Sequence, residues 1–423
     1  MRKVTNQKTG ACRFCQTPLQ NTFVDLGMSP LCEDFLRPEE LKNMEPFYPL
    51  HVYVCENCFL VQLEEFVSPE VIYRDYRYFS SYSSSWLKHA EEYTDKMLQR
   101  FQISGHHLVC ELASNDGYLL QYFKAKQIPV LGVEPAANVA RFAVEKGITT
   151  EMKFFGNATV QSLIDTYGRA DLLIGNNVLA HVPDLNDFVS AMKLFLNKEG
   201  LVTMEFPHLL TLMECNQFDT IYHEHFSYLS FTTVNLIFEK HGLTLFDVEE
   251  IPTHGGSLRI YARHQEDQSR NITANVGALL KKELNSGMRS LEYYSCFTTR
   301  VNALKRAILQ FLITAKETGK TVAGYGAPGK GNTLLNYCGI RRDFIDYTVD
   351  RNPHKHGTFL PGSLIPVYHP DKIRETRPDY VFILPWNLRT EVMEQLHYIG
   401  DWGGRFVVPI PEVKIYERSR ELA

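Results

Sequence analysis

Two Cys-x2-Cys pairs near the start of the chain constrain its folding more than any other feature. Cys12 and Cys15 form the first pair, and Cys55 and Cys58 form the second. Each pair can present two thiolates from one tight turn, and two facing turns give the tetrahedral S4 geometry that Zn²⁺ prefers. Four thiolates leave no open position on the metal, so we expect a structural zinc site. Two redox dithiols or four unrelated cysteines are the alternative interpretation.

Length and charge limit the classes of protein that the chain can belong to. Its 423 residues are enough for two or three domains. A net charge of -5 argues against nucleic acid as the main partner, because phosphate binding needs clustered Lys and Arg. No apolar run approaches the roughly 20 residues that a membrane span requires. The nine cysteines and a charged start without an apolar stretch predict a cytoplasmic protein.

Strands and helices alternate along the middle of the chain. Strands are expected within 107–117, 129–135, 171–182 and 200–207, with helices at 86–101, 117–127 and 136–147. Two further strands, 242–252 and 257–264, flank the turn 253–256 and predict an antiparallel hairpin. Such alternation is typical of a parallel sheet with both faces covered, which binds ligands at the carboxyl ends of its strands.

The first strand-to-helix turn, residues 111–117, carries small residues and carboxylates. Small residues let the backbone approach a ligand closely, and carboxylates can hold an ammonium group or a hydroxyl. Glu134 ends the second strand, where an acidic side chain can accept both hydroxyls of a ribose. Because the turn lacks a G-x-G-x-x-G run, it suits S-adenosylmethionine better than NAD, although a purely structural turn is the alternative. The candidate cofactor-binding residues are Glu111, Ala113, Ser114, Asn115, Gly117, Glu134, Pro135, Asn176 and Asn177.

Residues 221–228 concentrate two histidines, a glutamate and two tyrosines. The H-E-H spacing differs from H-E-x-x-H, in which a helix presents both histidines on one face, so a metal site is the less favoured interpretation. Acid–base chemistry fits better, because imidazole titrates near neutral pH and a neighbouring carboxylate can orient it. His181 is expected at the same carboxyl edge of the sheet.

The C-terminal part begins with a long helical pattern over 275–320. A strand then runs into Gly324-x-Gly326-x-x-Gly329, and Asp350 follows about 20 positions later, which is the dinucleotide-binding pattern. Alone, this pattern would indicate an NAD-dependent oxidoreductase. We expect the glycine loop instead to pack close to the substrate's nucleotide or to the central domain, because no hydride chemistry is evident elsewhere.

Several of these motifs occur together and in order: the cysteine pairs, CELASNDGYLL, NNVLAHVPDL, YHEHFSYLS and GYGAPGKGNTLLNY. Together they resemble the sugar C-methyltransferases, which act on nucleoside-diphosphate-linked deoxyhexoses in tetronitrose and noviose-type pathways. The resemblance covers essentially the whole chain. It implies an α/β protein with three parts: a zinc-binding domain (1–70), a class I methyltransferase domain of Rossmann-like fold that binds S-adenosylmethionine (71–265), and a second Rossmann-like domain (266–423).

The resemblance also implies a substrate and a set of site residues. The substrate would be a dTDP-linked 4-keto deoxysugar methylated at C3, and we expect a monomer. His225 would be the general base, with Tyr222, Glu224 and His181 shaping the pocket. The tyrosine-rich segment 76–82 would close over cofactor and sugar. The expected substrate-binding residues are Tyr76, Phe79, Tyr82, His254, Gly329, Lys330 and Asn332.

The chemistry independently favours a base in such a site. Carbon is a poor nucleophile until a proton α to the ketone is removed, so a base must take that proton while donors stabilise the enolate. An O-methyltransferase needs no such carbanion. An NAD-dependent oxidoreductase and a non-catalytic zinc scaffold that binds a sugar nucleotide remain the alternative functions.

Overall fold

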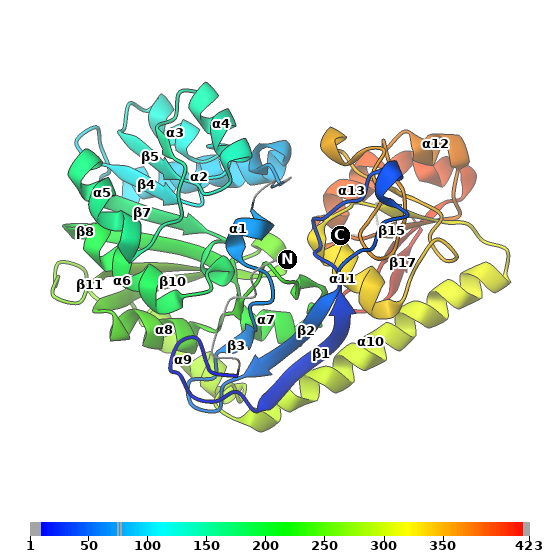
Figure 1. Cartoon of the computed structure of the whole chain (residues 1–423), viewed down its shortest axis with the longest axis horizontal. Coiled ribbons are helices and arrows are strands. Elements are labelled where there is room, and N and C mark those ends of the chain that lie inside the picture. Colours follow the sequence, from blue (N-terminus) through cyan, green and yellow to red (C-terminus); the bar gives the residue numbers. More distant parts are fainter. Residues whose placement is uncertain (1–9, 74–75, 77, 418–423) are drawn as a thin grey trace. The chain divides into compact units, whose positions relative to one another are not determined.

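The structure is a computed structural model that describes residues 10–73, 76 and 78–417 (Figure 1). The expectation drawn from the charged start of the chain falls on residues 1–9, outside the described residues. The chain forms two compact units, each assembled from several segments: unit 1 comprises Met1–Asn21, Val54–Leu210 and Glu224–Leu291, and unit 2 comprises Thr22–Tyr53, Thr211–His223 and Glu292–Ala423. The three-domain boundaries given above stay a prediction.

Unit 1 is built on a 7-stranded sheet with the order β10-β11-β8-β7-β4-β5-β6. The strands from β4 to β8 are parallel, and β11 is antiparallel to both of its neighbours. The chain starts this sheet at β4 and then builds outward on both sides, so a crevice is expected at the carboxyl end of β4. The strands are β4 (Val109–Leu112), β5 (Val130–Val133), β6 (Thr150–Glu151), β7 (Ala170–Asn176), β8 (Leu196–Pro207), β10 (Leu243–Ile251) and β11 (Ser257–His264).

Helices cover both faces of this sheet, as alternation along the buried strands requires. Val109 faces a core formed with α2 and α3, whereas Cys110 and Leu112 face a core formed with α5, α6, α8 and α9. The helices are α2 (Ser84–Phe101), α3 (Leu120–Ala125), α4 (Ala137–Glu145), α5 (Asn157–Tyr167), α6 (Leu185–Phe195), α8 (Phe231–Lys240) and α9 (Ala274–Asn285). The expected helices and strands of the central part, the hairpin included, are therefore confirmed.

Several short elements lie in the segments between this sheet and the cysteine pairs. Strand β3 (Val61–Leu63) follows the second pair and is antiparallel to β9 (Ser227–Tyr228), which lies in the histidine-rich segment. The 3-10 helix η3 (Leu179–His181) follows β7 and packs against β8 and β9. Helix α1 (Pro69–Ile72) precedes the tyrosine-rich segment, and α7 (Leu209–Glu214) follows β8.

Unit 2 contains a 6-stranded sheet with the order β14-β13-β12-β15-β16-β17, parallel except for β17. Its strands are β12 (Val322–Tyr325), β13 (Thr348–Val349), β14 (Val367–Tyr368), β15 (Tyr380–Ile383), β16 (Arg405–Val408) and β17 (Lys414–Tyr416). Its helices are α11 (Gly329–Cys338), α12 (Lys372–Thr376) and α13 (Arg389–Gln395), and the unit also holds β1 (Asn21–Ser29) and β2 (Tyr48–Val54). The expected second α/β sheet is confirmed.

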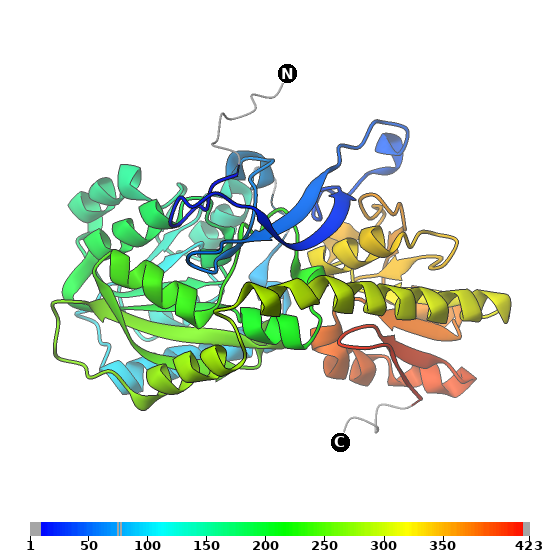
Figure 2. The same cartoon turned by 90° about the horizontal axis from the view of Figure 1, so that it is seen from below.

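The long helical pattern over 275–320 forms two helices rather than one. α9 ends at Asn285, and α10 (Leu291–Glu317) begins after five intervening residues and then continues unbroken (Figure 2). Gly287 between them has a φ of 92°, a left-handed conformation that glycine adopts at little cost and that ends a helix. Among the described residues, no helix is both long enough and apolar enough to cross a membrane.

A buried carboxylate in α9 fixes the start of α8. Glu283 accepts hydrogen bonds from the backbone N–H of Phe231 (2.7 Å), from the backbone N–H of Thr232 (2.8 Å) and from Nε2 of His208 (2.8 Å). It thereby satisfies donors that the first turn of a helix leaves unpaired. Burial alone would raise the pKa of Glu283, but the hydrogen bonds from His208 and Thr232 outweigh burial and hold it below its ordinary value.

We expect Glu283→Gln to lower the free energy of unfolding by about 2–4 kcal/mol, because an amide cannot accept from all of these donors and leaves some of them buried and unpaired. The exposed Glu250, which pairs with Lys282, provides the control: Glu250→Gln should change it by less than about 0.5 kcal/mol. Urea denaturation of both variants measures the difference. Because the pKa of Glu283 is lowered in the folded protein, its contribution to the free energy of unfolding should be lost as the pH falls below the ordinary pKa of glutamate.

Candidate functional site

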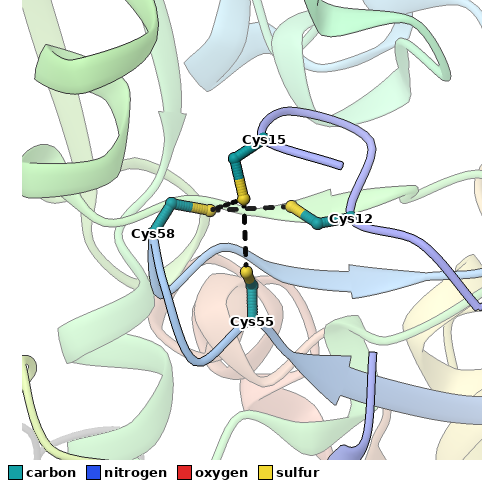
Figure 3. Close-up of side chains that lie close together, drawn as sticks. All are labelled: Cys12, Cys15, Cys55 and Cys58. Atoms are coloured by element: carbon teal, nitrogen blue, oxygen red, sulfur yellow. Dashed lines mark hydrogen bonds between the residues drawn. The ribbon is translucent and has the colours of Figure 1, made fainter. Parts of the chain in front are cut away.

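The four cysteines of the two pairs converge on one point of unit 1 (Figure 3). Their sulfur atoms all lie within 4.8 Å of one another, and Cys15 Sγ is 3.5 Å from the sulfurs of both Cys55 and Cys58. These distances exceed a disulfide bond, which is about 2.05 Å. They match the separation of about 3.7 Å between ligands on a tetrahedral ion with Zn–S bonds of about 2.3 Å. The cluster therefore fits a structural zinc ion.

Both cysteine turns have the same backbone geometry. The N–H of Cys12 donates to the carbonyl of Thr17 at 2.8 Å, and the N–H of Cys55 donates to that of Leu60 at 3.0 Å. The residue after each second cysteine is left-handed, Gln16 with a φ of 65° and Phe59 with a φ of 58°. Two equivalent turns that face each other present four sulfurs in the arrangement that the sequence spacing predicts.

The turn after β4 is held in an unusual backbone conformation. Ala113, Asn115 and Gly117 all have positive φ values, of 54°, 50° and 75°. The φ of Gly117 is one that L side chains rarely adopt, and a Cβ there would lie 3.2 Å from Cβ of Ala143 and 2.3 Å from Cδ1 of Ile148, so glycine is favoured. The turn consequently packs tightly on Ala143 and Ile148, and it lies at the carboxyl end of β4.

Glu134 joins this turn to the end of β5. Its carboxylate accepts from the backbone N–H of Asn115 at 2.9 Å and from that of Ala136 at 2.8 Å. Burial raises the pKa of Glu134 to about 7, although these two hydrogen bonds act in the opposite direction. Each carboxylate oxygen retains a further lone pair that can accept a hydrogen bond from a hydroxyl, as binding of a ribose requires.

Buried polar atoms at this edge have no hydrogen-bond partner among the described residues. They are both carboxyl oxygens of Glu111, Ser114 Oγ, Asp116 Oδ1 and Asn176 Oδ1. Burial also raises the pKa of Glu111 well above its usual range, because a carboxylate there is desolvated. All five atoms can accept a hydrogen bond, and three of them are carboxyl oxygens. A cationic ligand that carries N–H and O–H donors, such as S-adenosylmethionine, fits this donor-poor, acidic environment.

The tyrosine-rich segment is fastened to the same edge. The amide of Asn115 accepts from the N–H of Ser80 at 2.9 Å and donates to the carbonyl of Tyr78 at 3.1 Å. Asn138 of α4 donates to the carbonyl of Tyr76 at 2.7 Å. Phe79 packs edge-on against the ring of Phe142, with centroids 5.1 Å apart, and also contacts Tyr82. Tyr76, Phe79 and Tyr82 therefore lie close to the predicted cofactor turn.

Two histidines from distant parts of the sequence meet near this edge. The rings of His181 in η3 and His225 before β9 have centroids 4.6 Å apart and are nearly perpendicular. The hydroxyl of Tyr73 lies 2.9 Å from Nδ1 of His181. Burial, and to a smaller extent His225, lower the pKa of His181 well below its usual value. The sequence motifs gave no indication of the contact made by Tyr73.

The other residues of the histidine-rich segment have separate environments. Glu224 is buried in unit 1, whereas Tyr222 and His223 belong to unit 2. His223 lies with Nε2 3.1 Å from the carbonyl of Pro49, and burial lowers its pKa to about 4. His223 is thus held as a neutral structural side chain within unit 2. The roles of Tyr222 and Glu224 stay predictions.

A second polar contact lies at the end of β7. Asn177 has a φ of 55°, and its Nδ2 lies 3.0 Å from Nε2 of His254, in the turn of the β10–β11 hairpin. The ring of Trp86 lies edge-on to His254, with centroids 5.1 Å apart. The hairpin therefore returns His254 to the edge where Asn176 and Asn177 end their strand.

In unit 2, the glycine loop packs against its own protein neighbours. A Cβ on Gly326 would lie 2.5 Å from the ring of Pro385, and one on Gly329 would lie 2.9 Å from Cys32 Sγ. Asp350 accepts from the backbone N–H of Ala327 at 2.7 Å and from that of Asn352 at 2.8 Å. These contacts explain the glycines and the acidic residue without a dinucleotide, so the fingerprint does not support an NAD site.

Lys330 follows this loop and lies among polar side chains of unit 2. Its Nζ donates to Asn387 Oδ1 at 3.0 Å and lies 4.9 Å from the centroid of the Trp386 ring. Burial lowers the pKa of Lys330, while the nearby Asp219 opposes that shift. Asp219 accepts from Trp386 Nε1 at 2.7 Å, and burial raises its pKa to about 7. Sequence motifs did not single out Asp219.

Asn332 has a structural contact in the same unit. Its Nδ2 donates to the carbonyl of Cys32 at 2.5 Å, while its Oδ1 has no partner among the described residues. The predicted substrate-binding residues thus fall in two groups: Tyr76, Phe79, Tyr82 and His254 in unit 1, and Gly329, Lys330 and Asn332 in unit 2.

Comparison with known proteins gives three consecutive family matches. Residues 12–73 match a model described as "Putative zinc binding domain", residues 86–248 match "Methyltransferase domain", and residues 252–411 match "C-methyltransferase C-terminal domain". The chain is also 34% identical to C-methyltransferase NovU of Streptomyces niveus over 411 residues, which covers 97% of this chain and 98% of NovU.

Solved structures resemble the chain more distantly. A magnesium protoporphyrin IX methyltransferase from Synechocystis PCC 6803 is 14% identical, with 46% of this chain and 88% of that chain covered and a TM-score of 0.32. An S-adenosylmethionine-dependent methyltransferase from Mesorhizobium loti is 15% identical, with 42% and 100% covered and a TM-score of 0.34.

The sheet order, the turn after β4 and the family matches define an S-adenosylmethionine-dependent methyltransferase with a four-cysteine zinc-binding region. The similarity to NovU along nearly its full length is more specific, and the chain belongs to the C-methyltransferase family. The predicted fold class, enzyme class and cofactors are confirmed.

Proposed function

We propose that this C-methyltransferase methylates C3 of a dTDP-linked 4-keto deoxysugar and that His225 removes the C3 proton. The observation that carries the proposal is the contact between His181 and His225, with ring centroids 4.6 Å apart, in the unit that holds the cofactor turn. A methyltransferase that acts on carbon must first generate a carbanion, and a histidine pair supplies a base for that step.

Two imidazoles at this separation are not readily both positively charged, because like charges in a buried site repel each other. His181, whose pKa is lowered well below its usual value, stays neutral at neutral pH. A neutral His181, with Tyr73 at its Nδ1, can orient the neighbouring ring without competing for the substrate proton. His225 is therefore the member of the pair that we assign as the base.

The residues at the carboxyl edge of unit 1 would hold the cofactor. Glu134 would accept the ribose hydroxyls, and Glu111, Ser114, Asn115 and Asn176 would surround the rest of the molecule, with Ala113, Gly117, Pro135 and Asn177 forming the backbone around it. S-adenosylmethionine supplies an electrophilic methyl group when bound. The tyrosine-rich segment, which is fastened to Asn115 and Asn138, would exclude water from that edge.

The proposed substrate class is supported by the similarity to NovU and by polar side chains of unit 2. NovU is a C-methyltransferase at 34% identity over almost the whole chain, which favours a carbon acceptor here as well. In unit 2, Lys330 offers a cation and Asn332 an unpartnered amide oxygen. Within unit 1 we assign Tyr76, Phe79, Tyr82 and His254 to the sugar, and the nucleotide-binding role of Gly329, Lys330 and Asn332 of unit 2 stays a prediction.

Proton exchange tests the assignment of the base directly. The enzyme is incubated in D₂O with S-adenosylhomocysteine, which cannot donate a methyl group, and with a dTDP-linked 4-keto deoxysugar. We expect the wild-type enzyme to accelerate exchange of the C3 proton, followed by proton NMR, and His225→Ala to show only the enzyme-free rate. Exchange by the variant at the wild-type rate would refute the role of His225.

A further inference from the structure

We infer that Arg13, which lies inside the first cysteine pair, positions the His181–His225 pair and so connects the metal cluster to the reacting site. Arg13 acts through the segments that carry the two histidines and is therefore a positioning residue. The inference deepens the proposed function and rests on it, because it assigns to the zinc-binding region a task in the reaction besides folding.

The guanidinium of Arg13 holds the chain beside both histidines. Nη1 donates to the carbonyl of Pro183 at 2.7 Å, and Nη2 donates to the carbonyl of Leu63. Its Cζ also lies 5.5 Å from the ring centroid of Phe226. Pro183 comes two residues after His181, and Phe226 directly follows His225. The guanidinium thus holds the backbone two residues after His181 and lies over the side chain that follows His225.

The strand that carries Leu63 completes this connection. The N–H of Leu63 donates to the carbonyl of Phe226 at 3.0 Å, and Gln62 of β3 is paired with Ser227 of β9. The N–H of Phe226 in turn donates to the carbonyl of Ala180 at 2.8 Å, next to His181. Arg13 therefore spans segments that are already joined by backbone hydrogen bonds, and it sets the spacing between them.

Arg13 is itself fixed from the cysteine cluster. Its backbone N–H donates to Gln62 Oε1 at 2.9 Å, and Gln62 Nε2 donates to Cys12 Sγ at 3.2 Å. Asn186 of α6 donates to the carbonyl of Arg13 at 3.2 Å. With its backbone held on both sides, the guanidinium position follows from the geometry of the cysteine turn. A displaced cluster would therefore displace the two histidines.

The test compares Arg13→Met and Arg13→Lys with the wild-type enzyme. Methionine keeps the apolar stem but donates no hydrogen bond, and lysine offers one point charge in place of a two-pronged donor. We expect Arg13→Met to lower kcat about 10- to 100-fold, with KM within about twofold and one zinc per chain retained. Arg13→Lys should restore part of kcat.

Arg263→Met is the matched control. Arg263 also donates to backbone carbonyls, those of Arg270 and His264, but it lies at the opposite end of β11 from Ser257, which pairs with Pro207. We expect the kcat of Arg263→Met to stay within about twofold of wild type. An arginine at that end of β11 contributes to stability and does not hold the segments that carry the histidines. An equal loss of kcat in both variants would overturn the inference.

A readout that needs no substrate separates this inference from the proposed function. The imidazole ¹⁵N signals of His181 and His225 can be assigned from variants that lack each ring. We expect Arg13→Met to shift both signals and Arg263→Met to leave them unchanged. Unchanged signals in Arg13→Met, or loss of its zinc, would overturn the positioning role. Shifted signals together with a wild-type enzyme inactive on keto sugars would refute only the proposed function.

Discussion

Replacing His225 by alanine should abolish methyl transfer while leaving the affinity for S-adenosylmethionine nearly unchanged. The base removes the C3 proton before any carbon–carbon bond can form, and its loss typically costs a factor of about 10² to 10⁴ in rate. His225 is 8% exposed and contacts His181, whereas Glu134 accepts hydrogen bonds from the backbone of Asn115 and Ala136. Initial rates measure the first effect, and calorimetric titration with S-adenosylmethionine measures the second.

His264→Ala is a suitable control for this experiment. His264 ends β11 and lies with Nε2 3.3 Å from the carbonyl of Leu196, at the start of β8 and so at the opposite edge of the sheet from the cofactor turn. This variant should retain turnover close to that of the wild-type enzyme. Wild-type turnover in His225→Ala would show that another group takes the proton, and loss of cofactor binding would show that His225 belongs to the cofactor site.

Replacing Cys12 by serine should remove zinc and sharply reduce the yield of folded protein. Cys12 is fully buried, and a serine hydroxyl is a poor ligand in place of a thiolate. Structural zinc contributes about 10–16 kcal/mol of apparent binding free energy in small zinc-binding peptides, so a damaged site forfeits much of that contribution. Metal analysis of the purified protein and thermal unfolding measure the two effects.

Serine variants of two cysteines outside the cluster distinguish the loss of zinc from the other effects of replacing a cysteine by serine. Cys110 is buried in β4, so Cys110→Ser introduces a buried hydroxyl without touching the cluster, and Cys296 is exposed. Both variants should keep one zinc per chain, and only Cys110→Ser should lose stability. A normal zinc content in Cys12→Ser would rule out the four-thiolate site.

Local patterns in the sequence predicted the elements that form by local rules. The Cys-x2-Cys spacing, the alternating strands and helices, and the hairpin around residues 253–256 all formed as expected, because each depends on nearby residues. The break between α9 and α10 was missed because the apolar period continues across it. Gly287 was the signal that marked this break, since its left-handed φ ends a helix.

Contacts between distant segments could not be predicted in the same way. The sequence motif around Asp350 indicates a ribose-binding carboxylate, but in the fold Asp350 accepts from the backbone of its own glycine loop. No motif assigns a contact to the side chain of Arg13 or Tyr73, and their contacts beside the histidines arise only when segments more than a hundred residues apart pack together. Sequence periodicity contains no information about such packing.

Transfer of a labelled methyl group tests whether the enzyme methylates C3 of a keto sugar. The enzyme is supplied with a dTDP-linked 4-keto deoxysugar and S-adenosylmethionine that carries a ¹³C methyl group, and the product is examined by carbon–proton correlation NMR. We expect a ¹³C methyl group bonded to C3 of the sugar. A methyl group on oxygen, or the absence of any transfer, would contradict it.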